Sequence, residues 1–499
     1  MSQNGQLKIL LLAAEVVPFA KTGGLADVAG TLPKAIRALG HDIRVALPRY
    51  GRIRPDQFHL KEVLPAFDVP IHRTTEPARL LQATISPDVP VYMVDNAHYF
   101  DREGIYMYPD DADRFIFFCR AILEALKRLE WQPDVIHCHD WHTAIVPNWL
   151  NTIYKDDPFF SKTVSVYTIH NLAYQGIFGY RVLEIAGIDA WGFLYHAELA
   201  DLDGVVDLMG RGIYWADLVS TVSETYAHEI LTPEYGERLD PLLRDRRDRL
   251  FGILNGIDYE TANPATDPHL TVNFDANTLD RRAENKRSLQ REARLPEDPN
   301  VPLIGIVSRL TDSKGFDILS EVIDHVLDLG VQLVLMGTGE QHFHDVFGRM
   351  VQKYPRQAAI FLTFNAALTS RIYAGSDVTL MPSRVEPCGT NQMLAMRYGS
   401  VPIVRATGGL ADTVQDFDPT SGLGTGFVFE KYDRWMLFAA LVRALETFKH
   451  RDVWRQIQLR GMHSDFSWDR SAAKYVDLYR KAIATRIRRP DLEEYRVQP

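Results

Sequence analysis

Short apolar runs alternate with amphipathic stretches along the chain, and this alternation restricts the possible folds more than any other feature of the sequence. Short apolar runs bounded by turn residues are typical of parallel strands that are buried on both faces. Two series of such strands, separated by helical patterns, predict an α/β protein with two doubly wound units. The runs occupy residues 7–15, 42–48, 89–95, 133–139 and 163–171 in the first half, and residues 301–310, 331–339, 358–365, 377–383 and 401–407 in the second.

The length of the chain also predicts two domains. The sequence has 499 residues, more than the roughly 250–300 at which a single hydrophobic core stops growing. Residues 253–302 are rich in Pro, Asn, Asp and charge, and no strand or helix pattern persists there until a helix expected at residues 281–294. We therefore expect a boundary near residues 257–268, which divides the chain into a first domain at 1–262, a second at 263–475 and a C-terminal helix and tail at 476–499.

The composition argues against several classes of partner. The formal net charge is −10 and no long Lys/Arg run occurs, which disfavours a nucleic-acid or anionic membrane surface. No stretch approaches the roughly 20 uninterrupted apolar residues of a membrane helix. The first apolar run ends at Glu15 with no basic segment before it, which indicates a strand rather than a signal peptide. Because three cysteines in a chain of this size also fit a reducing compartment, we expect a cytoplasmic protein.

The sequence TGGLAD occurs twice, at residues 22–27 and 407–412, each time after a strand-like run and before a helix-like one. Glycine permits close approach of the backbone to a ligand, and the amides at a helix N-terminus attract anions. Two interpretations stay open at this point: a phosphate-binding loop, or a tight strand-to-helix turn. Lys21 directly precedes the first copy. Arg309 and Lys314 follow the first strand of the second half, where a doubly wound sheet binds its ligand, and their charges suit a diphosphate.

Polar side chains end two neighbouring strands of the first half. The segment HCHDWH at residues 137–142 invites a metal interpretation, but its histidines alternate along a strand end and lack a familiar ligand spacing. We therefore predict no metal site there. Asp140 and His170 are the stronger candidates for ligand contacts, because polar groups at the carboxyl ends of buried strands are costly in a core and useful at a binding site.

Glu386 follows a strand of the second half and precedes Pro387 and Gly389, which shape the turn, and its carboxylate can bind sugar hydroxyls or stabilise an oxocarbenium ion. A helix-capping acid is the alternative interpretation. Fingerprints of other enzymes are missing from the sequence: it has no Gly-x-Gly-x-x-Gly after the first strand, no Gly-x-x-x-x-Gly-Lys-Ser/Thr loop and no Gly-x-Ser-x-Gly elbow. Dehydrogenase, nucleoside triphosphatase and α/β-hydrolase functions therefore lack support.

Eight segments in order resemble the bacterial glycogen synthases and plant starch synthases, from about residue 8 to residue 479. The resemblance implies the GT-B fold, in which two Rossmann-like domains face each other with the active site in the interdomain cleft. It also implies transfer of glucose from ADP-glucose to the non-reducing end of an α-1,4-glucan (glycogen, starch or a malto-oligosaccharide), with retained anomeric configuration and without a metal or other cofactor. The segments are KTGGLADVAGTLPKAI, HCHDWHTA, TIHNLAYQG, TVSETYAHEI, LNGID, SRLTDSKG, SRVEPCGTNQ and TGGLADTV.

The resemblance assigns roles by motif match. His170 is expected at the 6-hydroxyl side of the donor glucose, Asp140 in the sugar or acceptor pocket, and Glu386 against the donor glucose. Front-face attack, in which the leaving diphosphate takes the acceptor proton, is favoured over double displacement through Glu386. The other expected donor contacts are Lys21, Gly23 and Gly24 from the first domain, Asn255 nearby, Arg309 and Lys314 at the diphosphate, the amides of Cys388 and Gly389, and Phe364, either stacked on the base or a plain core residue.

Two departures from the family pattern qualify these roles. The family commonly has Leu-Thr after EPCG, whereas this chain has Thr390-Asn391, which puts the phosphate contacts there in question. Leu394 stands where related sucrose and trehalose-type enzymes carry a second Glu, in agreement with the glycogen and starch synthase branch. Use of UDP-glucose, initiation of new chains, and a silent glucan-binding scaffold remain the competing functions.

Overall fold

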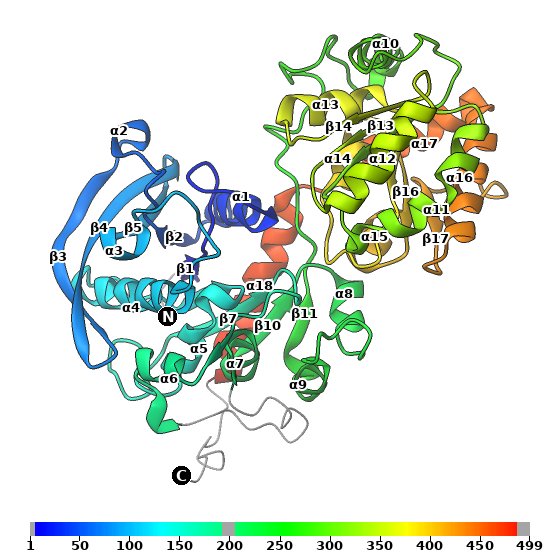
Figure 1. Ribbon diagram of the computed structural model, residues 1–499. Coiled ribbons are helices and arrows are strands. Elements are labelled where there is room, and N and C mark those ends of the chain that lie inside the picture. The colour runs from blue at the N-terminus through cyan, green and yellow to red at the C-terminus, as the bar shows by residue number, and fades with distance from the viewer. Residues whose placement is uncertain (1–4, 192–204, 487–499) are drawn as a thin grey trace. The chain divides into compact units, whose positions relative to one another are not determined.

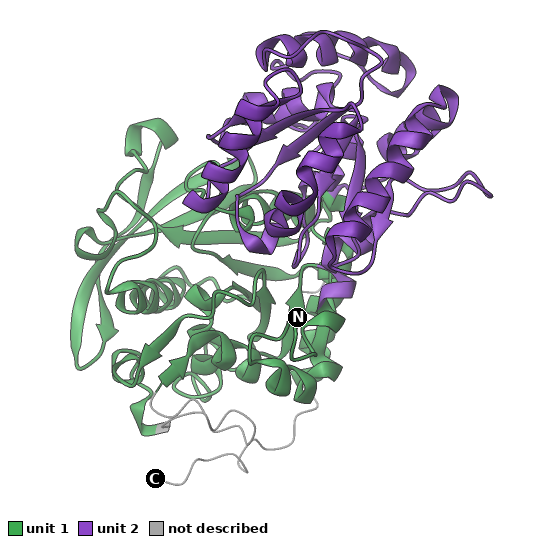
Figure 2. Ribbon diagram, turned by 45° about the vertical axis from the view of Figure 1, so that its right-hand side comes forward, with its two compact units in different colours: residues 1–222, 227–256, 468–499 green, residues 223–226, 257–467 purple. Residues whose placement is uncertain are grey.

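The computed structural model describes residues 5–191 and 205–486, which form two compact units (Figures 1 and 2). Unit 1 comprises residues 1–222, 227–256 and 468–499, and unit 2 comprises residues 223–226 and 257–467. The main division after residue 256 lies just before the expected boundary segment. The units differ from the expected domains at the C-terminal end, because the chain returns to unit 1 at residue 468 rather than leaving the second domain at 475. Residues 487–499 of the expected tail lie outside the described part.

Unit 1 is built on a nine-stranded sheet in the order β11-β10-β7-β6-β1-β2-β5-β4-β3. Its strands from β11 to β5 are parallel, and the buried run Ile9 to Leu12 of β1 lies at the centre. The strands are β1 (Lys8–Leu12), β2 (Asp42–Pro48), β3 (Lys61–Ile71), β4 (Thr74–Ser86), β5 (Val89–Asp95), β6 (Val135–His139), β7 (Val164–Ile169), β10 (Leu218–Thr221) and β11 (Leu250–Gly252), with a separate pair, β8 (Ile177–Gly179) and β9 (Val205–Asp207).

The helices of unit 1 include two long amphipathic ones, α1 and α4, whose apolar sides are buried. The α-helices are α1 (Gly24–Ala38), α2 (Pro55–Phe58), α3 (Ala97–Phe100), α4 (Asp111–Arg128), α5 (Ile145–Leu150), α6 (Arg181–Ile185), α7 (Leu208–Trp215), α8 (Glu224–Glu229, which begins in unit 2), α9 (Asp240–Asp245) and α18 (Trp468–Arg486).

The antiparallel pair β3 and β4 was not expected from the sequence. These strands form one edge of the sheet (Figure 1), and β3 is mostly exposed along its length. Three prolines, Pro65, Pro70 and Pro77, interrupt the pair. Proline within a run normally argues against a strand, but it is tolerated at a sheet edge, where ladder hydrogen bonds are missing on one side.

The C-terminal helix α18 packs against α1 and β7 of unit 1. Its buried residues include Tyr475 and Tyr479, and the ring of Tyr479 lies beside His137 of β6. The sequence predicted this helix but left open which domain it joins. The packing therefore brings residues 468–486 back to the core of the first unit.

Unit 2 has a six-stranded, fully parallel sheet in the order β14-β13-β12-β15-β16-β17. In chain order this is 3-2-1-4-5-6, the order of a Rossmann sheet. The strands are β12 (Leu303–Val307), β13 (Gln332–Met336), β14 (Ala358–Phe361), β15 (Val378–Met381), β16 (Val401–Arg405) and β17 (Phe427–Phe429), and the α-helices are α10 (Arg282–Glu292), α11 (Phe316–Asp328), α12 (Gln341–Lys353), α13 (Ala366–Gly375), α14 (Asn391–Arg397), α15 (Gly408–Thr413), α16 (Arg434–Phe448) and α17 (Arg451–His463).

Among the described residues, no helix is both long enough and apolar enough to cross a membrane.

Candidate active site

The sheet of unit 2 reverses its strand order between β12 and β15. In open α/β sheets, ligands bind at the carboxyl ends of the strands at such a switch point. The loop after β12 carries Arg309 and Lys314, and the loop after β15 carries Glu386 and the residues that follow it. The topology therefore places three of the predicted site residues at the expected position in unit 2.

Lys314 and Glu386 form an ion pair at this switch point. The Lys314 Nζ lies 2.5 Å from Glu386 Oε2, and the two side chains are 19% and 8% exposed. The hydroxyl of Ser383 donates a second hydrogen bond to the same carboxylate oxygen, over 3.1 Å. Both contacts fall on Oε2, which leaves Oε1 as the oxygen that can reach a ligand. The carboxylate is therefore oriented through one oxygen, and the other oxygen is left for a ligand.

Close backbone packing holds the two loops together. Gly315 has a φ of 80°, and a Cβ there would overlap the carbonyl oxygen of Pro382. The amide of Arg384 also donates to the carbonyl of Ser313 over 2.9 Å. Only glycine fits this left-handed position so close to another chain segment. The glycine after Lys314 therefore fixes the distance between Lys314 and Glu386.

The segment after Glu386 is held by side chains from inside the unit. The buried Gln392 donates to the carbonyls of Cys388 and Gly389 over 3.1 and 2.9 Å. Asn391 Nδ2 donates to the carbonyl of Val307 at the end of β12, over 2.8 Å. The amide of Asn391 is thus occupied within the unit, whereas Thr390, at the start of α14, makes no capping hydrogen bond with its side chain.

Arg309 and Phe364 also follow strands of this sheet, and both are exposed. Arg309 is exposed in the loop after β12. Phe364 follows β14, two strands from β12, and is 56% exposed. An aromatic ring exposed to that extent is not a plain core residue. The stacking interpretation of Phe364 remains a prediction.

The sheet of unit 1 reverses its order between β1 and β6. Lys21, Gly23 and Gly24 follow β1, and all three are exposed. A Cβ at either glycine would meet no atom within 4 Å. Lys21 is paired with Asp27 at 2.7 Å, with about half of each side chain exposed. The first TGGLAD copy therefore leaves open space over its two glycines.

Glu15 holds this loop through hydrogen bonds, although it was not among the predicted site residues. Its buried carboxylate accepts hydrogen bonds from the amides of Thr22 and Gly23, through Oε2. Tyr106 donates its hydroxyl to the other oxygen, Oε1, over 2.6 Å. A carboxylate at the end of a buried strand was the sequence signal that could have identified Glu15. No sequence pattern joins it to Tyr106, which lies 91 residues away.

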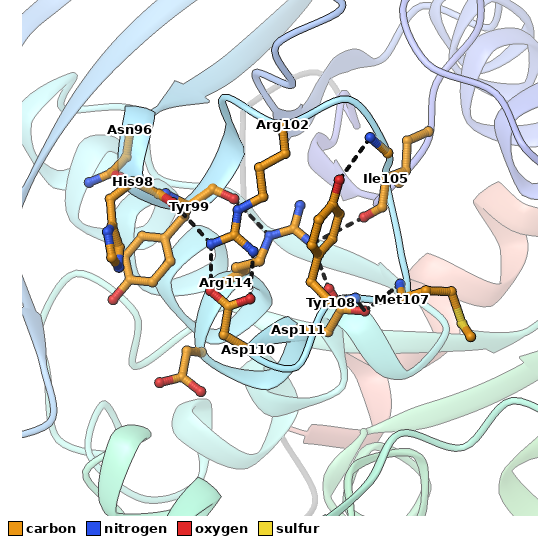
Figure 3. Close-up of polar contacts among 12 residues, drawn as sticks. Asn96, His98, Tyr99, Arg102, Ile105, Met107, Tyr108, Asp110, Asp111 and Arg114 are labelled. Atoms are coloured by element: carbon orange, nitrogen blue, oxygen red, sulfur yellow. Dashed lines mark hydrogen bonds and ion pairs between the residues drawn. The ribbon is translucent and has the colours of Figure 1, made fainter.

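The loop that carries Tyr106 is fixed by charged groups (Figure 3). Arg102 makes two hydrogen bonds to Asp110, over 2.5 and 2.6 Å. Arg114 lies 2.5 Å from Asp111. The ring of Tyr108 is contacted by both guanidinium groups, each 4.8 Å from its centroid. These contacts hold the loop at residues 102–110 against the first turn of α4, and the loop presents Tyr106 to Glu15.

Asp140 and His170 come together at the ends of the adjacent strands β6 and β7. The backbone amide of His170 donates to Asp140 Oδ1 over 2.8 Å. Asp140 has a positive φ of 54°, a conformation that costs energy for residues other than glycine and often occurs at functional sites. Burial raises the pKa of Asp140 to about 7, and the charge of Glu15 acts in the same direction. Burial lowers the pKa of His170 to about 3, so its ring is neutral near pH 7.

The other histidines of this segment are buried in the core. His137 contacts Tyr479 and Thr168 through its two ring nitrogens, at 2.8 and 2.6 Å. His142 packs against the rings of Tyr106 and Phe115. Within residues 5–191 and 205–486, no group of three or more His, Cys, Asp or Glu side chains is arranged to hold a metal ion.

Asn255 is not brought close to the unit 1 switch point. It follows β11, the edge strand, which three strands (β10, β7 and β6) separate from β1. Its side chain is buried, and Oδ1 has no hydrogen-bond partner among the described residues. Of the residues expected in the first domain, Lys21, Gly23, Gly24, Asp140 and His170 therefore gather at one place, while Asn255 lies at the edge of the sheet.

Comparisons with known proteins give matches along most of the chain. Residues 8–245 match the model of the starch synthase catalytic domain, and residues 287–458 match that of glycosyl transferases group 1. A glycogen synthase of Desulforudis audaxviator is 47% identical over 487 residues, which cover 96% of this chain and 97% of the relative. A glycogen synthase of Thermotoga maritima is 44% identical over 484 residues, covering 96% and 99%.

A solved structure shows the same architecture. The catalytic domain of starch synthase IV from Arabidopsis thaliana, bound to ADP and acarbose, superposes with a TM-score of 0.88 at 34% identity and covers 96% of this chain and 100% of its own. This likeness confirms the predicted α/β fold of the GT-B class, with two Rossmann-like domains. With sequence relatives that cover nearly its whole length, the chain belongs to the glycogen synthase and starch synthase family of glucosyltransferases.

Proposed function

We propose that this protein transfers glucose from ADP-glucose to the non-reducing end of an α-1,4-glucan and retains the anomeric configuration. The observation that carries the proposal is the ion pair of Lys314 with Glu386 at the switch point of unit 2. It puts a cation and an oriented carboxylate at the place where a Rossmann sheet binds a nucleotide. The solved starch synthase IV relative, bound to ADP and acarbose, supports the choice of an adenine nucleotide and a glucan.

Unit 2 would hold the leaving group. Arg309 offers a bidentate fork to the diphosphate and Lys314 a second charge. The hydroxyl of Thr390 would serve as the phosphate contact in place of the family's usual threonine, because the amide of Asn391 is bound to Val307. Phe364, exposed beyond β14, would stack on the base.

Donor contacts are also assigned to residues of unit 1. Lys21 and the amide of Gly24 would meet the donor phosphates, because the amides of Thr22 and Gly23 already donate to Glu15. His170 would contact the 6-hydroxyl side of the glucose, and Asp140 would line the sugar or acceptor pocket. Glu386 Oε1 would face the donor glucose, where a carboxylate stabilises positive charge that develops at C1.

The reaction would proceed by front-face attack. The acceptor 4-hydroxyl oxygen forms a bond to C1 as the bond from C1 to the diphosphate oxygen breaks, and the hydroxyl proton passes to the departing phosphate. Because Arg309 and Lys314 neutralise the leaving group, no metal ion is needed for that charge. We also propose a cytoplasmic location, which the three buried free cysteines support.

The test is release of nucleoside diphosphate with and without glycogen, from ADP-glucose and from UDP-glucose, in wild type and in Glu386→Ala. We expect glycogen-dependent ADP release that falls at least about 100-fold in the variant and survives EDTA. Faster release from UDP-glucose would overturn the donor assignment. Glycogen binding without release from either donor would identify a scaffold instead.

A further inference from the structure

Three histidines lie together where β6 and β7 run side by side. His137 and His139 belong to β6 and are fully buried, and His170 directly follows β7. His139 Nδ1 is 2.8 Å from His170 Nε2. The second ring nitrogen of His139, Nε2, is buried and has no hydrogen-bond partner among the described residues. This unpartnered nitrogen determines how the protons are arranged on the pair.

Both histidines of the pair are neutral, and a single N–H···N hydrogen bond joins their rings. Burial lowers the pKa of His170 to about 3 and that of His139 well below its ordinary value. A neutral imidazole carries one N–H and one acceptor nitrogen. If His139 Nδ1 donates, His170 Nε2 accepts and the proton of His170 is on Nδ1. If His170 Nε2 donates, the proton of His139 is on its Nε2. The two rings therefore always adopt the same tautomer.

The surroundings of His139 select between these two arrangements. The second arrangement buries an N–H donor at His139 Nε2 with no acceptor, whereas the first leaves only a lone pair there. Unpaired buried N–H groups are rarer in proteins than under-satisfied acceptors, because a buried donor without an acceptor keeps its full desolvation penalty. The ring of His137 lies 4.1 Å away but supplies no acceptor, because Tyr479 and Thr168 engage both of its nitrogens.

We propose that His139 is a positioning residue that holds His170 as the Nδ1–H tautomer. Since Nε2 of His170 is bound to His139, Nδ1 is the ring nitrogen left to meet a ligand. His170 then donates a hydrogen bond to the sugar hydroxyl rather than accepting one. This step deepens the proposed function, because it rests on the contact of His170 with the 6-hydroxyl of the donor glucose.

The tautomer itself can be measured without any assay of activity. We would record nitrogen chemical shifts of the wild-type protein labelled with 15N-histidine, and assign the two rings from the spectra of His170→Gln and His139→Asn. The expected pattern for His170 is a protonated Nδ1 and a bare Nε2. The reverse pattern would overturn the inference, whatever the enzyme does. If wild type transferred no glucose, the proposed function would fail while these shifts still decided the tautomer.

A kinetic test separates positioning from mere folding. ADP-glucose analogues with fluorine or hydrogen in place of the 6-hydroxyl differ in their ability to accept a hydrogen bond. Wild type should use the fluoro analogue better than the deoxy analogue. His139→Leu should lower kcat about 5- to 100-fold and abolish that preference. The amide of His139→Asn can donate to His170 Nε2. This variant should therefore keep more of the wild-type kcat and more of the preference for the fluoro analogue than His139→Leu.

Thermal unfolding shows whether each variant is folded. A folded His139→Leu variant that keeps both the wild-type kcat and the preference for fluorine would overturn the positioning role. A wild type that treats the two analogues alike would overturn the donated hydrogen bond.

Discussion

The two copies of TGGLAD are identical in sequence and differ in structure. In the first copy Gly23 and Gly24 are exposed with open space above them, and the loop amides bind the carboxylate of Glu15. In the second copy Gly408 and Gly409 are buried, and a Cβ at either would overlap a carbonyl oxygen of the loop from Glu386 to Cys388. The amide of Gly409 donates to the carbonyls of Glu386 and Pro387, each over 3.2 Å.

The difference shows that the same glycines serve two purposes. The first copy presents backbone to the outside of its unit, as a ligand-binding loop requires. The second copy supports the neighbouring loop, so that the side chain of Glu386 is oriented toward Lys314. The aspartates that end the copies also differ, because Asp27 pairs with Lys21 whereas Asp412 caps the start of α8 through the amides of residues 224 and 225. The anion-binding interpretation therefore fits the first copy better than the second.

The largest effect is expected in the second copy. Gly409→Ala places a methyl group against the carbonyl of Cys388, and the buried loops have no space to move apart. Overpacking of this kind costs about 3 kcal/mol or more when backbone atoms are in the way. We expect a lower urea midpoint for unit 2 and a loss of activity in parallel. A variant as stable as wild type would show that the second copy is open like the first.

The matched change in the first copy should spare stability and affect binding. Gly23 has φ −137° and ψ −169°, which alanine adopts without strain, and no atom lies near the new methyl group. We expect the free energy of unfolding of Gly23→Ala to stay within about 0.5 kcal/mol of the wild-type value. The KM for ADP-glucose should rise about tenfold, because the methyl group occupies the space through which phosphates approach the backbone. An unchanged KM would remove the first copy from the donor site.

Asp140, near the first copy, gives a pH-dependent effect. Its folded pKa of about 7 lies above the ordinary value of 3.8, so the folded protein holds a proton that the unfolded chain has released. The contribution of this group to stability therefore falls as the pH rises from about 4 to about 7. Asp140→Asn has no carboxyl group to titrate, so its stability should not fall with pH for this reason. The amide side chain keeps an oxygen for the backbone amide of His170. Relative to wild type, the free energy of unfolding of the variant in urea should gain about 2–3 kcal/mol between pH 5 and pH 8. A difference independent of pH would contradict the raised pKa.

The smallest effect is expected at Tyr106, whose hydroxyl binds the carboxylate that holds the first copy. Tyr106→Phe removes the hydroxyl that binds Glu15 Oε1 and leaves the amides of the loop in place. Loss of one hydrogen bond to a charged group should raise the KM for ADP-glucose about three- to tenfold, with kcat nearly unchanged. Tyr108→Phe is the control in the same loop, since the hydroxyl of Tyr108 binds only the amide of Gly104 among the described residues. Equal effects of the two changes would mean that the KM depends on the integrity of the loop and not on the hydrogen bond to Glu15.

Most strands were predictable because burial on both faces leaves a continuous apolar run. The expected runs at residues 42–48 and 89–95 coincide with β2 and β5. The edge pair β3 and β4 was missed because its strands are polar and contain proline, and the three-residue strands β11 and β17 carry too few residues for a pattern. Among the site residues, those directly after a long buried strand were found. Their supports, such as Glu15 and Gln392, were not.

The sequence by itself determined the number of α/β units, the order of their main strands along the chain, and the family, because these depend on local periodicity and on residues at fixed spacing. Only the tertiary structure decided which unit the last helix joins, which copy of TGGLAD is open, and that Lys314 pairs with Glu386, 72 residues away. The physical reason is that burial and hydrogen-bond partners arise from segments distant in the chain, and identical local sequences acquire different roles when different neighbours pack against them.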